Sequence, residues 1–319
     1  MSVKNNAITD KVRTFYEGNP YPGLGDTLMM SSAEKLSPYF KGEGKVLFPG
    51  CGTGHGIVSM AKLRPDLECY GMDLSAPSLE IANQLAKKYG VNIKLSQGNY
   101  MEKLPWDFKF QYITLQGTLH HTADPKIALK NVVGSLEQDG LIHVNLYGKK
   151  YHTGKFEIIE MLDLLQADDT GNLQQRFELF KALQDKLNDK NIKDYILDFS
   201  LRTMWRWFNA KYSEFKNKIN KTSGAYPWHL RYDKLNQIWI DHFSNPNEKT
   251  YDIWETKELV EYAGLEVVDM MSLGKIRPQI LPDEWLMIMK NLNIWSQYRI
   301  MELISKEVGS VNFIARKVN

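Results

Sequence analysis

Four closely spaced glycines follow a short apolar run near residue 50. Val46, Leu47 and Phe48 have the composition of a buried strand, and an apolar face at helical spacing begins at Ile57. The residues between them include Gly50, Gly52, Gly54 and Gly56. A glycine loop between a buried strand and a helix predicts the first unit of a nucleotide-binding α/β sheet, in which a ligand approaches the backbone more closely than a Cβ atom would allow.

The spacing of the glycines excludes two common nucleotide-binding loops. Gly50, Gly52 and Gly56 leave one residue too many for the dinucleotide-binding pattern G-x-G-x-x-G, and the Gly-Lys-Ser/Thr of a P-loop does not occur in the sequence. The next predicted strand, residues 67–73, ends at Asp73. A carboxylate at the end of that strand can accept hydrogen bonds from both hydroxyl groups of a ribose. Together, the loop and the acid predict a site for a ribose-containing ligand.

The sequence Gly50-Cys51-Gly52-Thr53-Gly54 resembles motif I of the class I S-adenosylmethionine-dependent methyltransferases. Asp73 and the segment Leu119-His120-His121 fit the same family. The resemblance covers residues 45–150 through motifs and residues 257–317 through the order of elements. It is closest to a broad, poorly characterised bacterial group, so it implies a cofactor and leaves the methyl acceptor open.

The resemblance implies a set of cofactor-binding residues at the carboxyl ends of the strands. S-adenosylmethionine, or its product S-adenosylhomocysteine, is expected to contact Gly50, Cys51, Gly52, Thr53, Gly54, Asp73, Leu74, Asn99, Tyr100, Gln116 and Gly117.

Two positions depart from the family pattern. Phe48 replaces an acidic residue that helps to hold the methionine end of the cofactor, so we expect Gln116, Gly117 and the backbone amides of residues 50–54 to hold it instead. Asn99 replaces an aspartate, although its amide oxygen can still accept a hydrogen bond from the adenine amino group.

Methyl transfer from a sulfonium depends chiefly on positioning, and a general base is needed only if the acceptor must lose a proton. His120 and His121 are candidates for that base because histidine titrates near neutrality, and a purely structural role for either remains open. Tyr21 is a further candidate catalytic residue, and Tyr16 and Tyr147 are candidate walls of the acceptor site. No metal is expected, since adjacent histidines on an extended segment point in opposite directions and no second ligand pair occurs.

The aromatic segment 15–23 contains two prolines and two glycines, which interrupt regular structure. It has two open interpretations: a lid over the cofactor, whose sulfonium aromatic rings would attract, or a surface loop that packs on the core.

The alternation of apolar runs predicts an α/β fold with a seven-stranded, mostly parallel, doubly wound sheet, an all-α insertion after strand five and an N-terminal lid segment. The strands are expected at residues 45–49, 67–73, 91–96, 110–115, 141–147, 265–271 and 310–317. The helices are expected at residues 7–17, 55–64, 76–89, 126–137, 257–262 and 283–308, with further helices in the insertion. We divide the chain into an N-terminal segment (1–44), a cofactor-binding core (45–150), a helical insertion or acceptor cap (151–250) and a C-terminal completion of the sheet (251–319).

The totals are those of an ordinary globular protein of 319 residues, with 43% hydrophobic and 24% charged residues. A formal net charge of +2 favours neither a nucleic-acid nor a membrane partner. The first residues lack the apolar run of a secretory signal, and no stretch approaches the ~20 apolar residues that span a bilayer. Two cysteines without a C-x-x-C pair are typical of reduced thiols, so we expect a cytoplasmic protein. Helical insertions can pair subunits, which leaves a homodimer open.

The sequence therefore predicts a methyltransferase (EC 2.1.1.-) that uses S-adenosylmethionine and acts on a small-molecule acceptor. Two alternatives remain open, namely a protein or peptide methyltransferase and a non-catalytic module that binds the cofactor.

Overall fold

The computed structural model describes residues 3–22, 28–166, 172–187, 241, 244–273, 281–305 and 309–318. The chain divides into two compact units, Met1–Lys150 with Pro246–Asn319, and Tyr151–Asn245. The expected helix at 195–219, the tryptophans at positions 205, 207 and 228, and Gly23 lie outside the described residues. The four-segment division of the chain stays a prediction.

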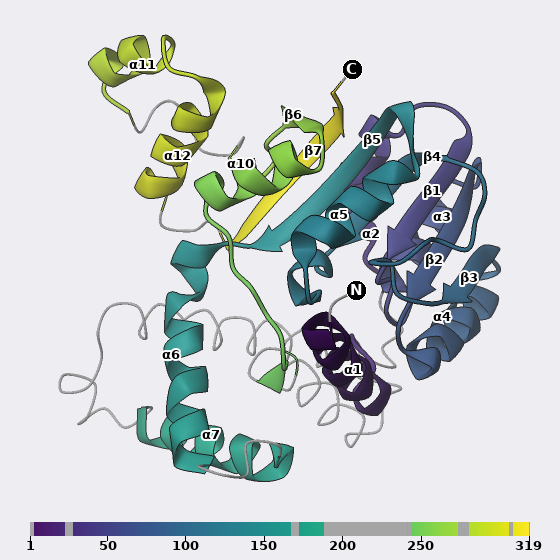
Figure 1. Ribbon diagram of the computed structural model, residues 1–319, viewed down its shortest axis with the longest axis vertical. Coiled ribbons are helices and arrows are strands. Elements are labelled where there is room, and N and C mark those ends of the chain that lie inside the picture. Colours follow the sequence, from purple (N-terminus) through teal and green to yellow (C-terminus); the bar gives the residue numbers. More distant parts are fainter. Residues whose placement is uncertain are drawn as a thin grey trace, which may run out of the picture. The chain divides into compact units, whose positions relative to one another are not determined.

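The first unit holds one seven-stranded sheet in the order β3-β2-β1-β4-β5-β7-β6 (Figure 1). Its strands are β1 (Gly44–Pro49), β2 (Leu67–Asp73), β3 (Ile93–Gln97), β4 (Phe110–Gln116), β5 (Leu136–Tyr147), β6 (Leu265–Asp269) and β7 (Ser310–Lys317). All neighbours among β1 to β5 are parallel, and β7 runs antiparallel to both β5 and β6. The predicted α/β fold with a mostly parallel sheet is confirmed.

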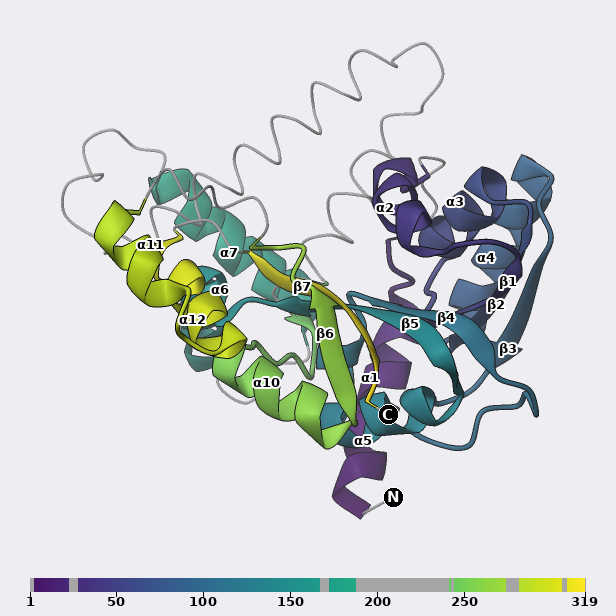
Figure 2. The ribbon, with the colours of Figure 1, turned by 90° about the horizontal axis from the view of Figure 1, so that it is seen from above.

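Helices cover both faces of this sheet, as Figure 2 shows. The elements on one face are α2 (Met30–Leu36), α3 (His55–Leu63) and α4 (Ala76–Tyr89), which share one apolar cluster with β1. The elements on the other face are α5 (Pro125–Gly134) and α10 (Ile253–Tyr262), which share a second cluster with β4 and β5. The short strands β1 and β4 are buried on both faces, as parallel strands in an α/β sheet must be.

The remaining helices of this unit are α1 (Val3–Gly18), α11 (Asp283–Met289) and α12 (Ile294–Ile304), with two 3-10 turns, η1 (Ser37–Tyr39) and η2 (Leu119–His121). The single helix expected at 283–308 is wrong, because Asn293 begins α12 as its N-cap and accepts a hydrogen bond from Ser296 N. Helix α10 begins four residues earlier than expected, since Asp252 and Glu255 form a capping box.

Strand β5 also differs from expectation. It begins at Leu136, before the expected residues 141–147, and contains Asp139 and Gly140, a pair typical of a turn, while α5 ends at Gly134. The pairing passes from Phe110↔Leu136 to Tyr112↔Leu141, so β5 bulges along β4. A Cβ at Gly140 would lie 2.9 Å from the backbone oxygen of Gln111, which explains why a glycine stands in a strand here.

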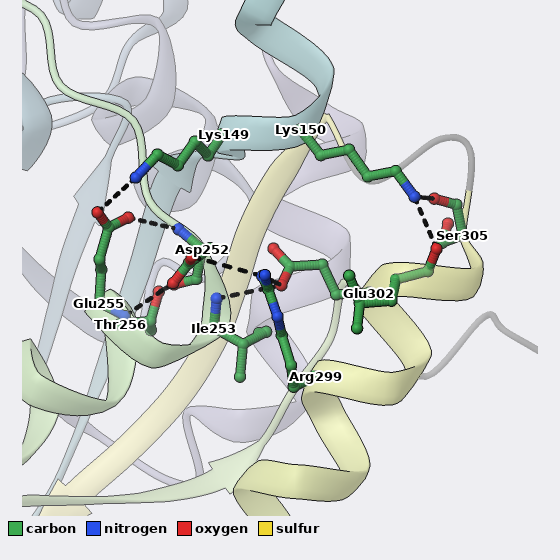
Figure 3. Close-up of polar contacts among 10 residues, drawn as sticks. Lys149, Lys150, Asp252, Ile253, Glu255, Thr256, Arg299, Glu302 and Ser305 are labelled. Carbon is green, nitrogen blue, oxygen red and sulfur yellow. Dashed lines mark hydrogen bonds and ion pairs between the residues drawn. The ribbon is translucent and has the colours of Figure 1, made fainter.

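Ion pairs connect the end of β5 to the C-terminal helices (Figure 3). Lys149 pairs with Glu255 at 2.7 Å, and Lys150 donates to the carbonyl oxygens of Leu303 and Ser305. The buried carboxylate of Glu302 on α12 accepts from Arg299 at 2.5 Å and from Ile253 N at 3.2 Å. The point at which the chain leaves the sheet is therefore fixed to α10 and α12.

The insertion after β5 is helical in its described part, as predicted, and contains α6 (Lys149–Gln166) and α7 (Leu173–Leu187). Arg176 of α7 is buried and donates to Asp163 Oδ1 at 2.6 Å and Gln166 Oε1 at 2.8 Å, both on α6. None of the helices in the described part of the chain combines the length and apolar content that crossing a bilayer requires.

Replacing Gly54 by alanine is expected to destabilise the fold more than replacing Gly90. Both residues have positive φ, 85° and 64°. A Cβ at Gly54 would lie 2.6 Å from Ala82 Cβ of α4, whereas a Cβ at Gly90 would meet no atom of the described residues within 4 Å. The left-handed conformation costs about 1–2 kcal/mol, and forcing α3 away from α4 adds about 1–3 kcal/mol. In urea unfolding, Gly54→Ala should therefore lose more free energy of unfolding than Gly90→Ala, and equal losses would contradict this packing.

Candidate functional site

Asp73 lies at the carboxyl end of β2 and connects the glycine loop to α4. Its Oδ2 accepts the N–H of Gly52 at 2.8 Å, and its Oδ1 accepts the N–H of Ser75 at 2.9 Å. Burial raises the pKa of Asp73 above its ordinary value, and the N–H donors of Ser75 and Gly52 oppose that rise by stabilising the charged form. The predicted strand-end acid therefore organises the loop that follows β1.

The backbone amides of the glycine loop all donate within the protein. Their acceptors are Met72 O for both Gly50 and Cys51, Asp73 for Gly52, Tyr21 O for Thr53, and Cys51 O for Gly54. We expected these amides to hold the methionine end of a cofactor, but they instead hold the loop. The loop's carbonyl oxygens are the backbone groups better suited to a ligand there, because the amino group of a methionine is a hydrogen-bond donor.

The N-terminal segment reaches the glycine loop through its backbone. The carbonyl oxygen of Tyr21 lies 3.1 Å from Thr53 N, and a Cβ at Gly52 would come within 2.6 Å of that oxygen. The carbonyl oxygen of Tyr16 accepts from Ser75 Oγ at 3.1 Å. At Gly52, the close neighbour that requires a glycine is therefore the protein's own N-terminal segment.

Asn99 and Tyr100 follow β3, at the same edge of the sheet. Asn99 Oδ1 accepts from Met101 N at 3.0 Å, which closes a turn. Tyr100 is buried, and its hydroxyl lies 2.9 Å from Thr118 Oγ1, in the loop after β4. That hydroxyl oxygen of Thr118 would also be 2.0 Å from a Cβ at Gly50, so the loops after β1, β3 and β4 meet at Thr118.

Gln116 ends β4 beside the start of α3, and Gly117 follows it. Gln116 Oε1 would lie 3.0 Å from a Cβ at Gly56, and Phe48 is buried next to it on the same side of the sheet. Gly117 is exposed. The carbonyl oxygen of Leu74 accepts a hydrogen bond from Gln97 Nε2 at 3.0 Å. The family pattern has an acid at position 48, near the end of β1. In this chain that position is Phe48, and the side-chain amide of Gln116 supplies a polar group beside it.

His120 and His121 lie in η2 directly after β4, and not on an extended segment as expected. Their ring centroids are only 4.2 Å apart, because a 3-10 turn does not alternate side chains as a strand does. In the described ranges, no three histidine, cysteine, aspartate or glutamate side chains come together in a way that would hold a metal ion.

The two histidines have different surroundings. His120 is fully buried, and its ring lies 4.1 Å from the ring of Tyr147. His121 is 6% exposed and lies between Tyr16 of α1, at 6.2 Å between ring centroids, and Tyr147 of β5, at 6.0 Å. Aromatic rings from two elements therefore enclose His121, and the Tyr21 backbone lies on the glycine loop.

Sequence reasoning did not predict which segment of the chain holds this histidine turn. Asn247 and Lys249 hydrogen-bond to residues 120–123 across a sequence separation of 125 residues or more. No periodicity or motif links positions so far apart. Thr118 was also missed, as was the capping role of Ser75, although a serine two residues after a strand-end acid and directly before a helix is a recognisable N-cap signal.

A family described as "Methyltransferase domain" matches residues 40–200 of the 319-residue chain. An uncharacterized protein of a Synechococcus strain is 23% identical over 280 residues, which are 85% of this chain and 60% of that protein. The uncharacterized methyltransferase YcgJ of Bacillus subtilis is 33% identical over 139 residues, which are 43% of this chain and 50% of that protein.

The solved structure of PKMT2 from Rickettsia typhi, in complex with AdoHcy, resembles this fold with a TM-score of 0.60 and 18% identity. The match covers 86% of this chain and 49% of that one. The chain thus spans between half and three fifths of the length of these relatives.

Neither cysteine is expected to react with N-ethylmaleimide in the native protein at pH 8. Burial, with the nearby charge of Asp73, raises the pKa of the Cys51 thiol well above its ordinary value, and burial raises the pKa of Cys69 to about 12. The reactive form is the thiolate, whose fraction falls as the pKa rises. Mass spectrometry should find both thiols unmodified before unfolding and both modified in urea. Alkylation of Cys51 in the native protein at the rate of a free thiol would contradict the closed loop.

Proposed function

The chain belongs to the methyltransferase domain family, and on that premise we propose that it is an S-adenosylmethionine-dependent methyltransferase whose small-molecule acceptor loses a proton to His121. The kind of acceptor, the residues that hold the cofactor and the base are all part of this proposal. The observation that carries it is the enclosure of His121 between aromatic rings. His121 lies in the 3-10 turn that directly follows Thr118, and Thr118 packs against Gly50 of the glycine loop.

The residues present suit the cofactor. Asp73 uses one lone pair of each carboxylate oxygen for Gly52 and Ser75, and a carboxylate offers about four acceptor sites in all. Capacity therefore remains for two ribose hydroxyls. We assign the adenine amino group to Asn99, beside Leu74 and Tyr100, and the methionine end to Gln116, Gly117 and the carbonyl oxygens of residues 50–54.

When bound, S-adenosylmethionine supplies the methyl group as its carbon–sulfur bond breaks, with the electron pair remaining on sulfur. The residues of this chain hold the acceptor's nucleophilic atom in line with that bond, which is the main source of acceleration for such a displacement. His121 takes the proton that the acceptor releases, a role worth roughly 10²–10⁴-fold in rate. His120 is assigned to packing, because its ring is fully buried against Tyr147.

The enclosure of His121 supports a small acceptor. A group that is 6% exposed, with rings on two sides, suits a molecule that is itself mostly buried on binding. The N-terminal segment adds to this enclosure, since Tyr21 O hydrogen-bonds to Thr53 N and Tyr16 O accepts from Ser75. We therefore propose that residues 15–22 act as a lid, with the aromatic ring of Tyr16 beside the acceptor.

The acceptor can be tested by label transfer. Wild-type protein with methyl-labelled S-adenosylmethionine and a complete cell extract should place label in the small-molecule fraction. His121→Gln should lower the rate by at least about 100-fold, the lower range for a general base. His120→Gln is the matched control for a neighbouring ring and should retain more of the transfer. Label that appears only in protein would contradict the small-molecule acceptor, and an unaffected His121→Gln would contradict the proposed base.

A further inference from the structure

The chain returns to the first unit through residues 246–251, which we name the return segment. It binds four consecutive carbonyl groups in and after η2. Lys249 N donates to His120 O at 3.0 Å, and Lys249 Nζ donates to Ala123 O at 3.0 Å. The side-chain amide of Asn247 donates to both carbonyl oxygens between them, at 2.9 Å to His121 and 2.8 Å to Thr122.

This arrangement is specific to a carboxamide. One Nδ2 group has two hydrogens, and Asn247 places them on two adjacent carbonyl oxygens. An aspartate at this position would have the same shape but no hydrogen to donate. Four consecutive carbonyl groups held by one segment fix the backbone of the histidine turn more firmly than its own single turn of 3-10 helix would.

The return segment also determines which nitrogen of His121 carries the proton. His121 Nδ1 lies 3.2 Å from the backbone oxygen of Asn247. A carbonyl oxygen only accepts hydrogen bonds, so Nδ1 must be the donor, and in the neutral ring the lone pair is then on Nε2. In many enzymes a histidine is held in its working tautomer in this way, by an acceptor that binds its other nitrogen.

We infer that Asn247 is a positioning residue that fixes the orientation and the Nδ1–H tautomer of His121, so that Nε2 is the atom that receives the acceptor's proton. This inference rests on the proposed function. Proton transfer converts the neutral ring into one protonated on both nitrogens, and the Asn247 carbonyl keeps its hydrogen bond from Nδ1 throughout. The rings that the described residues place beside His121 include those of Tyr16, His120 and Tyr147.

The tautomer can be measured without knowing the acceptor. Two-bond proton–nitrogen spectra of protein labelled with ¹⁵N in its seven histidines distinguish the Nδ1–H from the Nε2–H form, and His121→Gln identifies the signal. Spectra are recorded at a pH high enough for the histidine rings to be neutral. Wild-type protein should show the Nδ1–H form of His121. Asn247→Ala and Asn247→Asp should both lose it. Neither side chain can donate to the two carbonyl groups, so the backbone oxygen of residue 247 is no longer held beside His121 Nδ1.

Asn293→Ala serves as the matched control, because Asn293 is an asparagine that caps α12 outside the site. Its spectrum should match that of the wild type. A wild-type His121 in the Nε2–H form, or an unchanged tautomer in Asn247→Asp, would overturn the inference.

The rate of label transfer to the small-molecule fraction of the extract then separates positioning from general stability. Asn247→Asp should lower that rate by about 10–100-fold, with binding of S-adenosylhomocysteine changed less than about threefold. In a His121→Gln background, Asn247→Asp should cause no further loss, because it acts through His121. An additional loss of tenfold in that background would contradict the inference.

These outcomes also distinguish the two proposals. If wild-type protein transfers no label to small molecules, the proposed acceptor fails, while the spectra still decide the role of Asn247.

Discussion

The hydrogen bonds from the backbone N–H groups of Gly52 and Ser75 to the Asp73 carboxylate are the contacts on which the site depends. They connect the ends of two neighbouring parallel strands, and they stabilise the charged form of a carboxylate whose pKa burial raises. The tight loop at residues 50–54 follows from them, since each of its amides finds an acceptor inside the protein. In the cofactor site that we propose, the groups offered to the ligand are the remaining acceptor capacity of Asp73 and the carbonyl oxygens of the loop, which suit the hydroxyl and amino donors of S-adenosylmethionine.

The second constraint is the way in which the chain leaves the sheet and comes back. The outgoing strand and the return segment are bridged at Gly148↔Tyr251, and Tyr251 N donates to Tyr147 O at 2.8 Å. Lys149 and Lys150 are held by α10 and α12 (Figure 3). An insertion of about a hundred residues thus begins and ends on backbone that is fixed to the core. The same return segment holds the histidine turn, so the geometry of His121 depends on residues that follow the insertion.

The local features of this protein could be predicted from the sequence, and the contacts between distant segments could not. Strand β2 and helix α4 have the predicted bounds, because an apolar run, an N-cap serine and a left-handed glycine mark them locally. Asp139 and Gly140 suggested a turn, since a bulged strand and a turn have the same composition. The pairing of Asn247 with residues 121 and 122, and the approach of Tyr21 to Gly52, left no local signal. Because the internal acceptors of the glycine-loop amides could not be foreseen from the sequence, we expected those amides to bind a ligand.

Calorimetric titration with S-adenosylhomocysteine tests the organising role of Asp73 most directly. Wild-type protein should bind with micromolar affinity. Asp73→Asn should bind at least about tenfold more weakly, because a hydrogen bond to a charged group contributes about 1.5–3 kcal/mol. Asp269→Asn, at the end of the last strand in the sheet order, should bind as the wild type does. A folded wild-type protein that does not bind, or an Asp73→Asn variant that binds equally well, would contradict the account.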